Sequence, residues 1–324
     1  MKRYKPMVLI TATALVLSLG FSGCFGDSSS SSSSSSSKSS SSSSPSFSSS
    51  SSSAPSSSSL PADSSSGSMS ASASSSDLSS QPALNPNFSE LYSLDAAKKG
   101  WGPGTEKNDK GQPVGSLDYQ NKYGKYGADF IRLDDESAGK IYLTFDEGYE
   151  NGYTASILDT LKEKNAPAVF FITYSYATTN PELVQRMIDE GHIVGNHSYK
   201  HPCFPDISLE RAQEEVMFLH DYIKETYNYE MTLFRFPEGA FSEQMLGLLQ
   251  QLNYRCIFWS FAYRDWDVNA QIGASAAYEK VTYNAPDGAV YLLHAVSKDN
   301  AEILGSVIDN FREKGYELAS YPQA

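Results

Sequence analysis

Short apolar runs alternate with longer segments of helical periodicity from about residue 138 to the end of the chain. Such runs favour buried strands, and the segments between them favour amphipathic helices. This alternation is typical of a mainly parallel sheet covered by helices. We predict strands at 140–145, 168–173, 192–196, 232–236, 255–260, 289–293 and 316–319. We predict helices at 152–164, 181–190, 208–226, 242–252, 272–283 and 298–313.

Residues at the ends of these segments support the predicted helices. Asn180 precedes Pro181, and Ser208 precedes the segment at 208–226, so Asn180 and Ser208 are expected to cap helix starts. Gly191 and Gly315 each follow a predicted helix and precede a predicted strand, which is where a helix commonly ends in glycine. Seven strands with helices between them suggest an α/β barrel or a wound sheet.

The first 24 residues are typical of a bacterial export signal. They begin with three basic residues and continue into an apolar stretch too short to span a bilayer comfortably. The sequence from Phe21 to Cys24 resembles the lipobox of bacterial lipoproteins, in which the cysteine becomes the lipidated first residue, although Phe21 replaces the usual aliphatic residue. Ordinary cleavage nearby is the alternative. We expect an extracytoplasmic protein, lipid-anchored to the cell membrane through Cys24 and facing the cell wall.

Two further segments precede the domain with alternating strands and helices. Residues 25–83 are mostly serine, and a segment with so little apolar surface is expected to be a disordered linker. Residues 84–137 include the sequence WGPG at 101–104 and have weak periodicity. We predict that they form an irregular extension packed on the domain at 138–324.

The charge balance of the chain argues against nucleic acid as a partner. The chain has 38 acidic and 25 basic residues, a formal net charge of -13, and it lacks the excess of basic residues that a phosphate backbone requires. Apart from Cys24, the cysteines are Cys203 and Cys256, so a disulfide framework is not indicated. We expect the protein to be a monomer.

Polar side chains that could take part in catalysis lie at or after the ends of five of the predicted strands. They are Asp146 and Glu147, His197, Arg235, Asp265 and Asp267, and His294. The carboxyl ends of parallel strands meet at one edge of a sheet, where active sites of α/β folds gather. Five histidines occur in 324 residues, and three of them, His197, His201 and His294, lie near these positions. The sequence therefore predicts one active site at this edge.

The spacing of His197 and His201 favours a metal site. Residues four apart on a helix or tight turn place both imidazoles on one side, as two ligands of one divalent ion. Taken alone, the pair is weak evidence, because a surface turn with two solvated histidines has the same spacing.

Asp146 and His294 also have plainer interpretations. Asp146 could cap the turn that follows its strand, and His294 could be a buried histidine of the core. The catalytic interpretation gains from Arg235, whose cation could keep Asp146 ionised and oriented. It gains also from Asp265 or Asp267, either of which could stabilise the protonated form of His294 that a general acid needs near neutral pH.

Taken in order, the short sequences around these residues resemble the motifs of the polysaccharide deacetylases, also called the NodB-homology family or carbohydrate esterase family 4. TFDEG at 144–148 is similar to T-F-D-D-G, HSYKH at 197–201 to H-S/T-x-x-H, and RFPEG at 235–239 to R-x-P-x-G. RDWD at 264–267 and LLH at 292–294 are similar to the Asp-Trp and L-x-H motifs. The resemblance implies a distorted (β/α) barrel of about seven parallel strands, which agrees with the predicted strands.

Within the family, the chain is most similar to the delta-lactam-forming peptidoglycan deacetylases of spore-forming bacteria. The likeness is carried by TFDEGYENGYT, NHSYKHP, FPEGAFSE, FAYRDWDVN and LLHAVS. It implies a hydrolase that removes the N-acetyl group of N-acetylmuramic acid in peptidoglycan and releases acetate. The alternatives are N-acetylglucosamine, chitin oligosaccharides or xylan as substrate, or a glycan-binding lipoprotein with weak catalysis.

The resemblance also implies roles for individual residues. Asp146 is the expected general base, oriented by Arg235, and His294 the expected general acid. His197 and His201 are expected to ligate a divalent metal, with zinc as the expected ion. Asp265 is expected to tune the imidazole of His294 and Asp267 is the alternative. Trp266, Tyr149 and Glu238 are expected to line the sugar pocket.

Two positions depart from the family pattern. The second aspartate of T-F-D-D-G, normally the third metal ligand, is Glu147 here. Glutamate can ligate zinc through oxygen, but its extra methylene displaces the carboxylate. We expect Glu147 to be the third ligand, with a solvent-facing side chain as the alternative. Glu238 stands where many relatives have an aromatic residue, which is expected to alter the choice of substrate.

Overall fold

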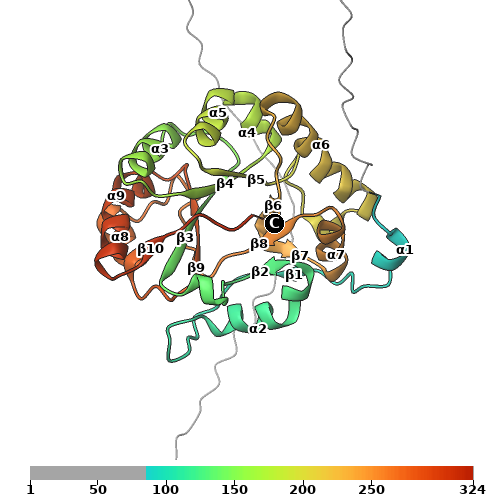
Figure 1. Cartoon of the computed structure of the whole chain (residues 1–324), viewed down its shortest axis with the longest axis horizontal. Helices are drawn as coiled ribbons and strands as arrows, with labels where there is room; N and C mark the ends of the chain where they lie inside the picture. Colours follow the sequence, from blue (N-terminus) through green and yellow to red (C-terminus); the bar gives the residue numbers. More distant parts are fainter. Residues whose placement is uncertain (1–84, 324) are drawn as a thin grey trace, which may run out of the picture. The chain divides into compact units, whose positions relative to one another are not determined.

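The strands predicted from the sequence are all present in the structure, a computed structural model that describes residues 85–323. They are β3 (Lys140–Glu147), β4 (Ala168–Ile172), β5 (Ile193–Asn196), β6 (Leu233–Phe234), β8 (Arg255–Ile257), β9 (Ala289–His294) and β10 (Glu317–Leu318). Helices surround these strands (Figure 1). The predicted export signal, Cys24 and the serine linker lie outside the described residues.

The strands belong to one parallel sheet of eight that curls around on itself. Its order is β10-β3-β4-β5-β6-β8-β2, where β2 is Ala128–Asp129, and β9 pairs with β3. Beyond β8, a parallel bridge joins Phe261 to Tyr291 in β9, and the Ser260 N–H donates to the Val290 carbonyl at 2.9 Å. The predicted distorted (β/α) barrel is therefore confirmed, with one short strand more than the sequence predicted.

The six predicted helices are present as well. They are α3 (Thr154–Glu163), α5 (Pro181–Asp189), α6 (Leu209–Tyr227), α7 (Glu243–Gln251), α8 (Ala274–Thr282) and α9 (Lys298–Glu313). Gly191 and Gly315 have φ angles of 81° and 89°, as a helix-ending glycine requires, and the Ser208 hydroxyl accepts from the Arg211 N–H at 3.2 Å. These predicted helix ends are confirmed.

Asn180 occupies the N-cap position of α5 as predicted, but its side chain does not cap this helix. Its side-chain amide donates instead to the Tyr176 carbonyl at 3.2 Å and to the Thr179 hydroxyl at 3.0 Å. Both acceptors belong to α4 (Tyr174–Thr179), a short helix that the sequence did not predict. Asn180 thus ends α4, while Pro181 begins α5 with a preset φ and without a side-chain cap.

Alternate residues of β3 face two different cores. Ile141, Leu143 and Phe145 belong to the larger core between sheet and helices, whereas Tyr142 belongs to the core inside the barrel. The inner core also contains Val169, Phe171, Ile193, Leu233, Ile257 and Val290. Because successive side chains of a strand point to opposite faces, Asp146 shares the inner face with Tyr142, and Glu147 shares the outer face with Phe145.

The region predicted as an extension packs on the barrel and also contributes to its sheet. Besides β2, it forms α1 (Phe88–Leu91), α2 (Val114–Tyr123) and β1 (Lys99–Gly100), which pairs antiparallel with β7 (Ala240–Phe241). The Trp101 indole donates to the Trp259 carbonyl at 3.0 Å, and its ring packs edge-on against Phe130. The two-residue strands in this region are too short to produce a pattern in the sequence.

The carboxyl-terminal segment closes the end of the barrel opposite to the carboxyl ends of the strands. Tyr321 lies in the inner core with its ring 5.0 Å from that of Tyr142. Its hydroxyl donates to a carboxylate oxygen of the buried Asp129 at 2.6 Å. Arg255 binds the same carboxylate through two hydrogen bonds, of 2.6 and 3.2 Å. Figure 1 accordingly places the end of the chain inside the ring of strands.

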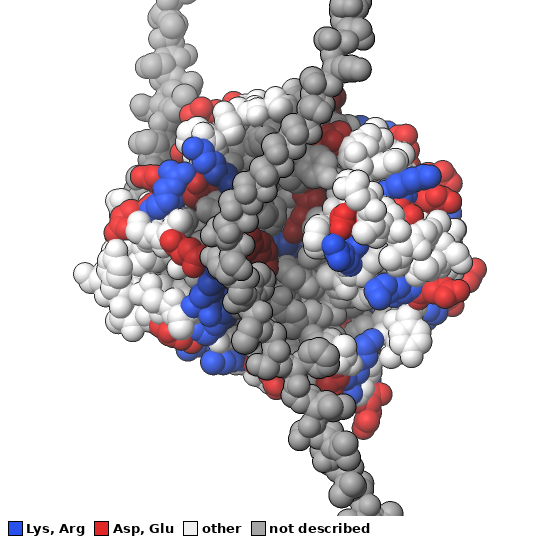
Figure 2. All heavy atoms as spheres, turned by 180° about the vertical axis from the view of Figure 1, so that it is seen from behind, with Lys and Arg blue, Asp and Glu red and all other residues white. Residues whose placement is uncertain are grey.

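The surface formed by the described residues has charges of both signs. Figure 2 shows acidic and basic side chains intermixed over the part of this face that residues 85–323 form. Among these residues, no helix combines the length and the hydropathy needed to cross a bilayer.

We predict that Tyr321→Phe lowers the free energy of unfolding by about 1–3 kcal/mol, because it removes a hydrogen bond to a charged, buried acceptor. Urea unfolding followed by circular dichroism measures the change. Tyr283→Phe is the control, because Tyr283 is 73% exposed, and it should have little effect. Equal stability of the Tyr321→Phe variant and the wild type would contradict this role of the carboxyl-terminal segment.

Candidate active site

A cavity of about 590 Å³ opens at the carboxyl ends of the barrel strands. Seven predicted site residues line it: Asp146, Tyr149, His197, His201, Glu238, Trp266 and His294. Asp146 and His294 are partners in the register of β3 and β9, so two residues far apart in the sequence lie side by side. The barrel therefore gathers the predicted acid, base and imidazole pair in one cavity.

Asp146 forms a buried ion pair with Arg235. The guanidinium donates to Asp146 Oδ1 at 2.7 Å and has no exposed surface. The carbonyls of Ile257 and Phe258 accept two further N–H groups of Arg235, at 2.9 and 3.3 Å. Because Arg235 is fixed at several points, it also fixes the orientation of the Asp146 carboxylate.

The charges around Asp146 keep its carboxyl ionised. Burial by itself would raise the pKa of Asp146, but the charges of Arg235, His197 and His294 and the hydrogen bond from Arg235 outweigh it and lower the pKa below the usual value. Arg235 occupies Oδ1, so Oδ2 is the oxygen that can accept a proton from a molecule in the cavity. Asp146 thus meets the electrostatic requirement for a general base.

His197 presents an unprotonated nitrogen to the same cavity. Its Nδ1 bonds to the backbone carbonyl of Arg235 at 2.8 Å, which requires Nδ1 to carry the proton. Nε2 is then the free nitrogen, and it lies 3.6 Å from Asp146 Oδ2. Burial lowers the pKa of His197 to about 4, against the opposing influence of Asp146, so the imidazole is neutral at neutral pH. A neutral imidazole is the form that binds metal.

His201 comes next to His197 through a loop and not through a helix or a regular turn. Their ring centroids are 4.8 Å apart, and Ser198 and His201 have φ angles of 75° and 55°. The Asn196 side chain accepts the Ser198 N–H at 2.8 Å, and the Ser198 hydroxyl accepts the His201 N–H at 2.9 Å. These bonds hold a backbone conformation that side-chain-bearing residues rarely adopt, and they keep both imidazoles at the cavity.

The prediction that Glu147 is the third metal ligand is wrong for this arrangement. β3 continues as a regular strand through Glu147, which pairs with Ile172 of β4, so its side chain points to the outer face. Both carboxyl oxygens are buried without a hydrogen-bond partner among the described residues. Burial raises the pKa of Glu147 well above its usual value, as do the nearby Glu150 and Asp146. The side chain therefore lies on the far side of the strand from the histidines, and it does not face solvent either.

The donor atoms present suit a divalent ion only in part. His197 and His201 supply two imidazole nitrogens, which is a donor type that suits zinc. Within residues 85–323, no group of three or more His, Cys, Asp or Glu side chains has an arrangement that could hold a metal. The pair fits an ion whose remaining positions are filled by water or substrate oxygen.

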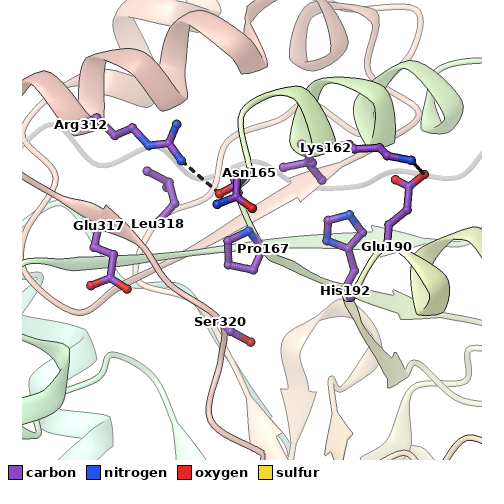
Figure 3. Close-up of a pocket in the computed structure, with 12 residues that line it drawn as sticks. Lys162, Asn165, Pro167, Glu190, His192, Arg312, Glu317, Leu318 and Ser320 are labelled. Atoms are coloured by element: carbon purple, nitrogen blue, oxygen red, sulfur yellow. Dashed lines mark hydrogen bonds and ion pairs between the residues drawn. The ribbon is translucent and has the colours of Figure 1, made fainter.

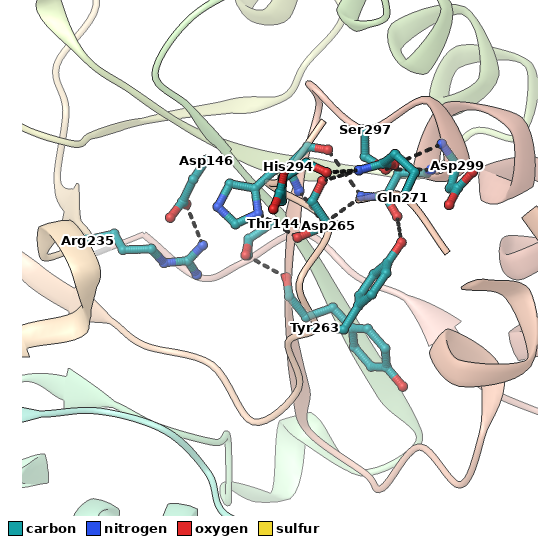
Figure 4. A network of polar contacts seen from close by, with 12 residues as sticks. Thr144, Asp146, Arg235, Tyr263, Asp265, Gln271, His294, Ser297 and Asp299 are labelled. Carbon is teal, nitrogen blue, oxygen red and sulfur yellow. Dashed lines mark hydrogen bonds and ion pairs between the residues drawn. The ribbon is translucent and has the colours of Figure 1, made fainter. Parts of the chain in front are cut away.

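His294 is paired with Asp265, and the alternative Asp267 is excluded. His294 Nδ1 lies 2.8 Å from Asp265 Oδ1, and its backbone N–H donates to Asp265 Oδ2 at 2.8 Å (Figure 4). Asp267 instead pairs with Arg264 at 2.7 Å. Burial alone would lower the pKa of His294, but the hydrogen bond and charge of Asp265, together with the charge of Asp146, raise it above the usual value. His294 is therefore poised to donate a proton through Nε2.

A polar network that the sequence did not predict holds Asp265 in place. The Asn300 amide donates to Asp265 Oδ2 at 2.6 Å and to the His294 carbonyl at 3.1 Å, and the Tyr263 hydroxyl donates to Asn300 Oδ1 at 2.5 Å. Asn300 lies in the first turn of α9, directly after the LLH string. The position of Asn300 after a predicted strand could have indicated a role in the site. Asparagine is, however, common at such positions because it caps helices.

The walls of the cavity are aromatic and partly exposed. Tyr149 and Trp266 are 52% and 53% exposed, as a sugar-stacking surface requires. Trp259 also lines the cavity, and the sequence did not predict it. Glu238 is exposed at the rim with a φ of 59°. These side chains leave the cavity open to a long ligand.

The extension forms part of the support for this wall. The indole N–H of Trp101 donates to the Trp259 carbonyl, and the backbone N–H of Trp101 donates to the Gly239 carbonyl at 3.0 Å. Gly239 lies so close to the Trp259 ring that a Cβ would come within 2.7 Å of it. The WGPG region thus positions Trp259 and the turn that carries Glu238.

A second cavity, of about 540 Å³, lies at the opposite end of the barrel (Figure 3). Lys162 pairs with Glu190 at 3.4 Å, and Arg312 donates to the Asn165 carbonyl at 3.2 Å. Burial lowers the pKa of His192, so its imidazole is neutral. This cavity has no carboxylate and imidazole arranged as base and acid, so the chemistry of the described residues is concentrated at the first cavity.

Comparison with known proteins agrees with the geometry. Residues 134–257 match the family model described as polysaccharide deacetylase. The peptidoglycan-N-acetylmuramic acid deacetylase PdaA of Bacillus subtilis (strain 168) is 41% identical over 197 residues, which are 60% of this chain and 74% of that protein. The peptidoglycan-N-acetylglucosamine deacetylase PgdA of Listeria monocytogenes serotype 1/2a (strain 10403S) is 33% identical over 181 residues, 56% of this chain and 38% of that protein.

The fold is shared with a solved structure as well. The structure of Bacillus subtilis PdaA, a family 4 carbohydrate esterase, matches with a TM-score of 0.65 and 36% sequence identity. The match covers 69% of this chain and 95% of that one.

We predict that Asp265→Asn lowers the pKa of His294, because it removes the main influence that raises this pKa and leaves burial, which lowers it. Asp267→Asn is the matched control, since Asp267 faces Arg264. NMR titration of the histidine ring resonances measures both variants. The same His294 pKa in wild type and Asp265→Asn would show that Asp265 does not control the protonation of this imidazole.

Proposed function

This chain belongs to the polysaccharide deacetylase family and is a hydrolase, and we propose that it removes the N-acetyl group of N-acetylmuramic acid in peptidoglycan, releasing acetate. The main support is the pair of register partners Asp146 and His294, a base and an acid with opposite pKa shifts in one open cavity. The choice of muramic acid is supported by the similarity to PdaA, which exceeds that to PgdA.

Asp146 is the proposed general base. Its Oδ2 accepts a proton from a water molecule, while Arg235 holds Oδ1 and keeps the carboxyl ionised beforehand. The water oxygen then attacks the carbonyl carbon of the acetamide and forms a tetrahedral oxyanion. The backbone at Gly148 and Tyr149 lines the cavity, and its N–H groups are candidates to stabilise this charge.

His294 is the proposed general acid. Protonation of the sugar nitrogen allows the carbon–nitrogen bond to break, so that a free amine and acetate are formed. Asp265 holds the proton-bearing imidazole with Nδ1 turned away from the cavity, which leaves Nε2–H for the departing nitrogen. His294 then regains a proton from solvent, and Asp146 loses the one it accepted.

His197 and His201 are proposed to hold a divalent metal, with zinc favoured by the nitrogen donors. When bound, such an ion polarises the acetyl carbonyl and stabilises negative charge on its oxygen. The protein's part is to fix the tautomer of His197 through the Arg235 carbonyl and to keep both rings at the cavity.

The place of action is proposed from the sequence and the substrate. Peptidoglycan lies outside the cytoplasmic membrane, and an export signal, a lipidated Cys24 and a long serine linker would carry the domain to it.

We predict that the wild type releases acetate from peptide-free peptidoglycan glycan and that Asp146→Ala lowers this activity by more than about 100-fold, the range expected for loss of a general base. Mass spectrometry of the digested glycan locates the lost acetyl group. Loss from glucosamine would replace the proposed substrate by N-acetylglucosamine. Glycan binding with no acetate release from wild type would indicate a binding protein instead.

We predict that His201→Ala weakens binding of Zn²⁺ by more than about tenfold, since even groups outside the ligand set contribute that much at metal sites. Glu147→Gln is the control, because Glu147 points away from the histidines, and it should leave the affinity nearly unchanged. Equilibrium dialysis with metal analysis measures both. A large loss of affinity in Glu147→Gln would restore this residue to the ligand set and contradict the geometry.

A further inference from the structure

A smaller cavity, of about 270 Å³, adjoins the active-site cavity. Gly148, Tyr149 and His201 line both cavities, so the two lie next to each other. The rest of its lining includes Ser175 and Lys200, and none of its lining residues is acidic. We refer to this hollow as the side cavity. A substrate whose acetamide lies in the main cavity can extend a neighbouring substituent into it.

The side cavity has a basic side chain and no acidic one. Asp146 and Glu238 give the main cavity two carboxyl groups, whereas Lys200 gives the side cavity an ammonium group. No ion pair joins Lys200 Nζ to a carboxylate among the described residues, and the ammonium instead lies 4.9 Å above the Tyr199 ring. An anionic substituent of the substrate is therefore attracted to the ammonium group of the side cavity.

Lys200 is presented by a rigid loop. Its backbone N–H donates to a carboxylate oxygen of the buried Glu215 at 2.7 Å, and the Tyr199 N–H donates to the Glu215 carbonyl at 3.0 Å. The other oxygen of the Glu215 carboxylate bonds to Arg211, so this acid is already paired. The Tyr199 ring is packed against Phe218, with centroids 4.2 Å apart. The backbone at Lys200 is fixed, which reduces the entropy lost when the lysine ammonium binds a ligand.

Building on the proposed function, we propose that the side cavity binds the lactyl carboxylate of muramic acid and that Lys200 is a specificity-determining residue. Muramic acid carries its lactyl ether on the ring carbon next to the one that bears the acetamido group. With the acetamide between Asp146 and His294, the carboxylate therefore has only a short distance to reach an adjoining hollow. N-acetylglucosamine has a hydroxyl at that carbon and offers Lys200 no charge, so the residue favours muramic acid with a free carboxylate.

Two glycans that differ in one group test this proposal. One is an oligosaccharide of N-acetylglucosamine and N-acetylmuramic acid with a free lactyl carboxylate, and the other has the same carboxylate converted to its methyl amide. Binding is measured by calorimetry in full-length protein with Asp146→Asn, which removes the proposed base, and kcat/KM is measured with Asp146 intact. Lys200→Met is compared with Lys125→Met, because Lys125 also lies exposed above a tyrosine ring, at 4.8 Å, outside both cavities.

We expect roughly three- to tenfold tighter binding of the free-carboxylate glycan, the range for a partly exposed charge-assisted contact. Lys200→Met should abolish this preference, Lys125→Met should retain it, and added salt should weaken it. The same preference in Lys200→Met, or none in the wild type, would overturn the proposal. Absence of acetate release from both glycans, with the binding preference intact, would instead contradict the proposed function and leave the side cavity as a carboxylate-binding site.

Discussion

The buried ion pair between Arg235 and Asp146 is the interaction on which the site depends. Arg235 has no exposed surface, lies 4.2 Å above the Phe171 ring, and donates to two carbonyls at the end of β8 as well as to Asp146. Its own backbone carbonyl fixes the tautomer of His197. Buried ion pairs contribute little net stability, because desolvation offsets their attraction. The pair is better explained by chemistry, since it keeps a buried carboxylate ionised and aimed at the cavity.

Side chains of the same chemical class have pKa values shifted in opposite directions because their surroundings differ. Asp146 and Glu147 are adjacent in β3, yet the strand turns one toward Arg235 and the other into the apolar layer beneath the helices. His197 and His294 differ in the same way. His197 is neutral because burial prevails, whereas Asp265 raises the pKa of His294 above its usual value. The cavity thus combines a base, a metal-binding imidazole and an acid at one pH.

The shape of the site suits a polymer. Exposed Tyr149 and Trp266 flank an open cavity, and a side cavity that contains Lys200 adjoins it. The amino-terminal extension stabilises the wall between Trp259 and Glu238 through Trp101. Residues remote from the reacting atoms therefore determine which substrates fit the site, while residues at the ends of the barrel strands provide its acid and base.

The sequence by itself determined the alternation of strands and helices, the barrel, and the positions of Asp146, His197, Arg235 and His294, because apolar periodicity and motif order are local properties of the chain. Only the tertiary structure chose Asp265 over Asp267 and turned Glu147 away from the histidines, because these outcomes depend on strand register and on which face a side chain occupies. It also revealed Asn300, Trp259 and the short strand β2, whose contacts join segments distant in sequence and leave no periodic signal. Local patterns thus specify the elements, and packing decides which side chains meet.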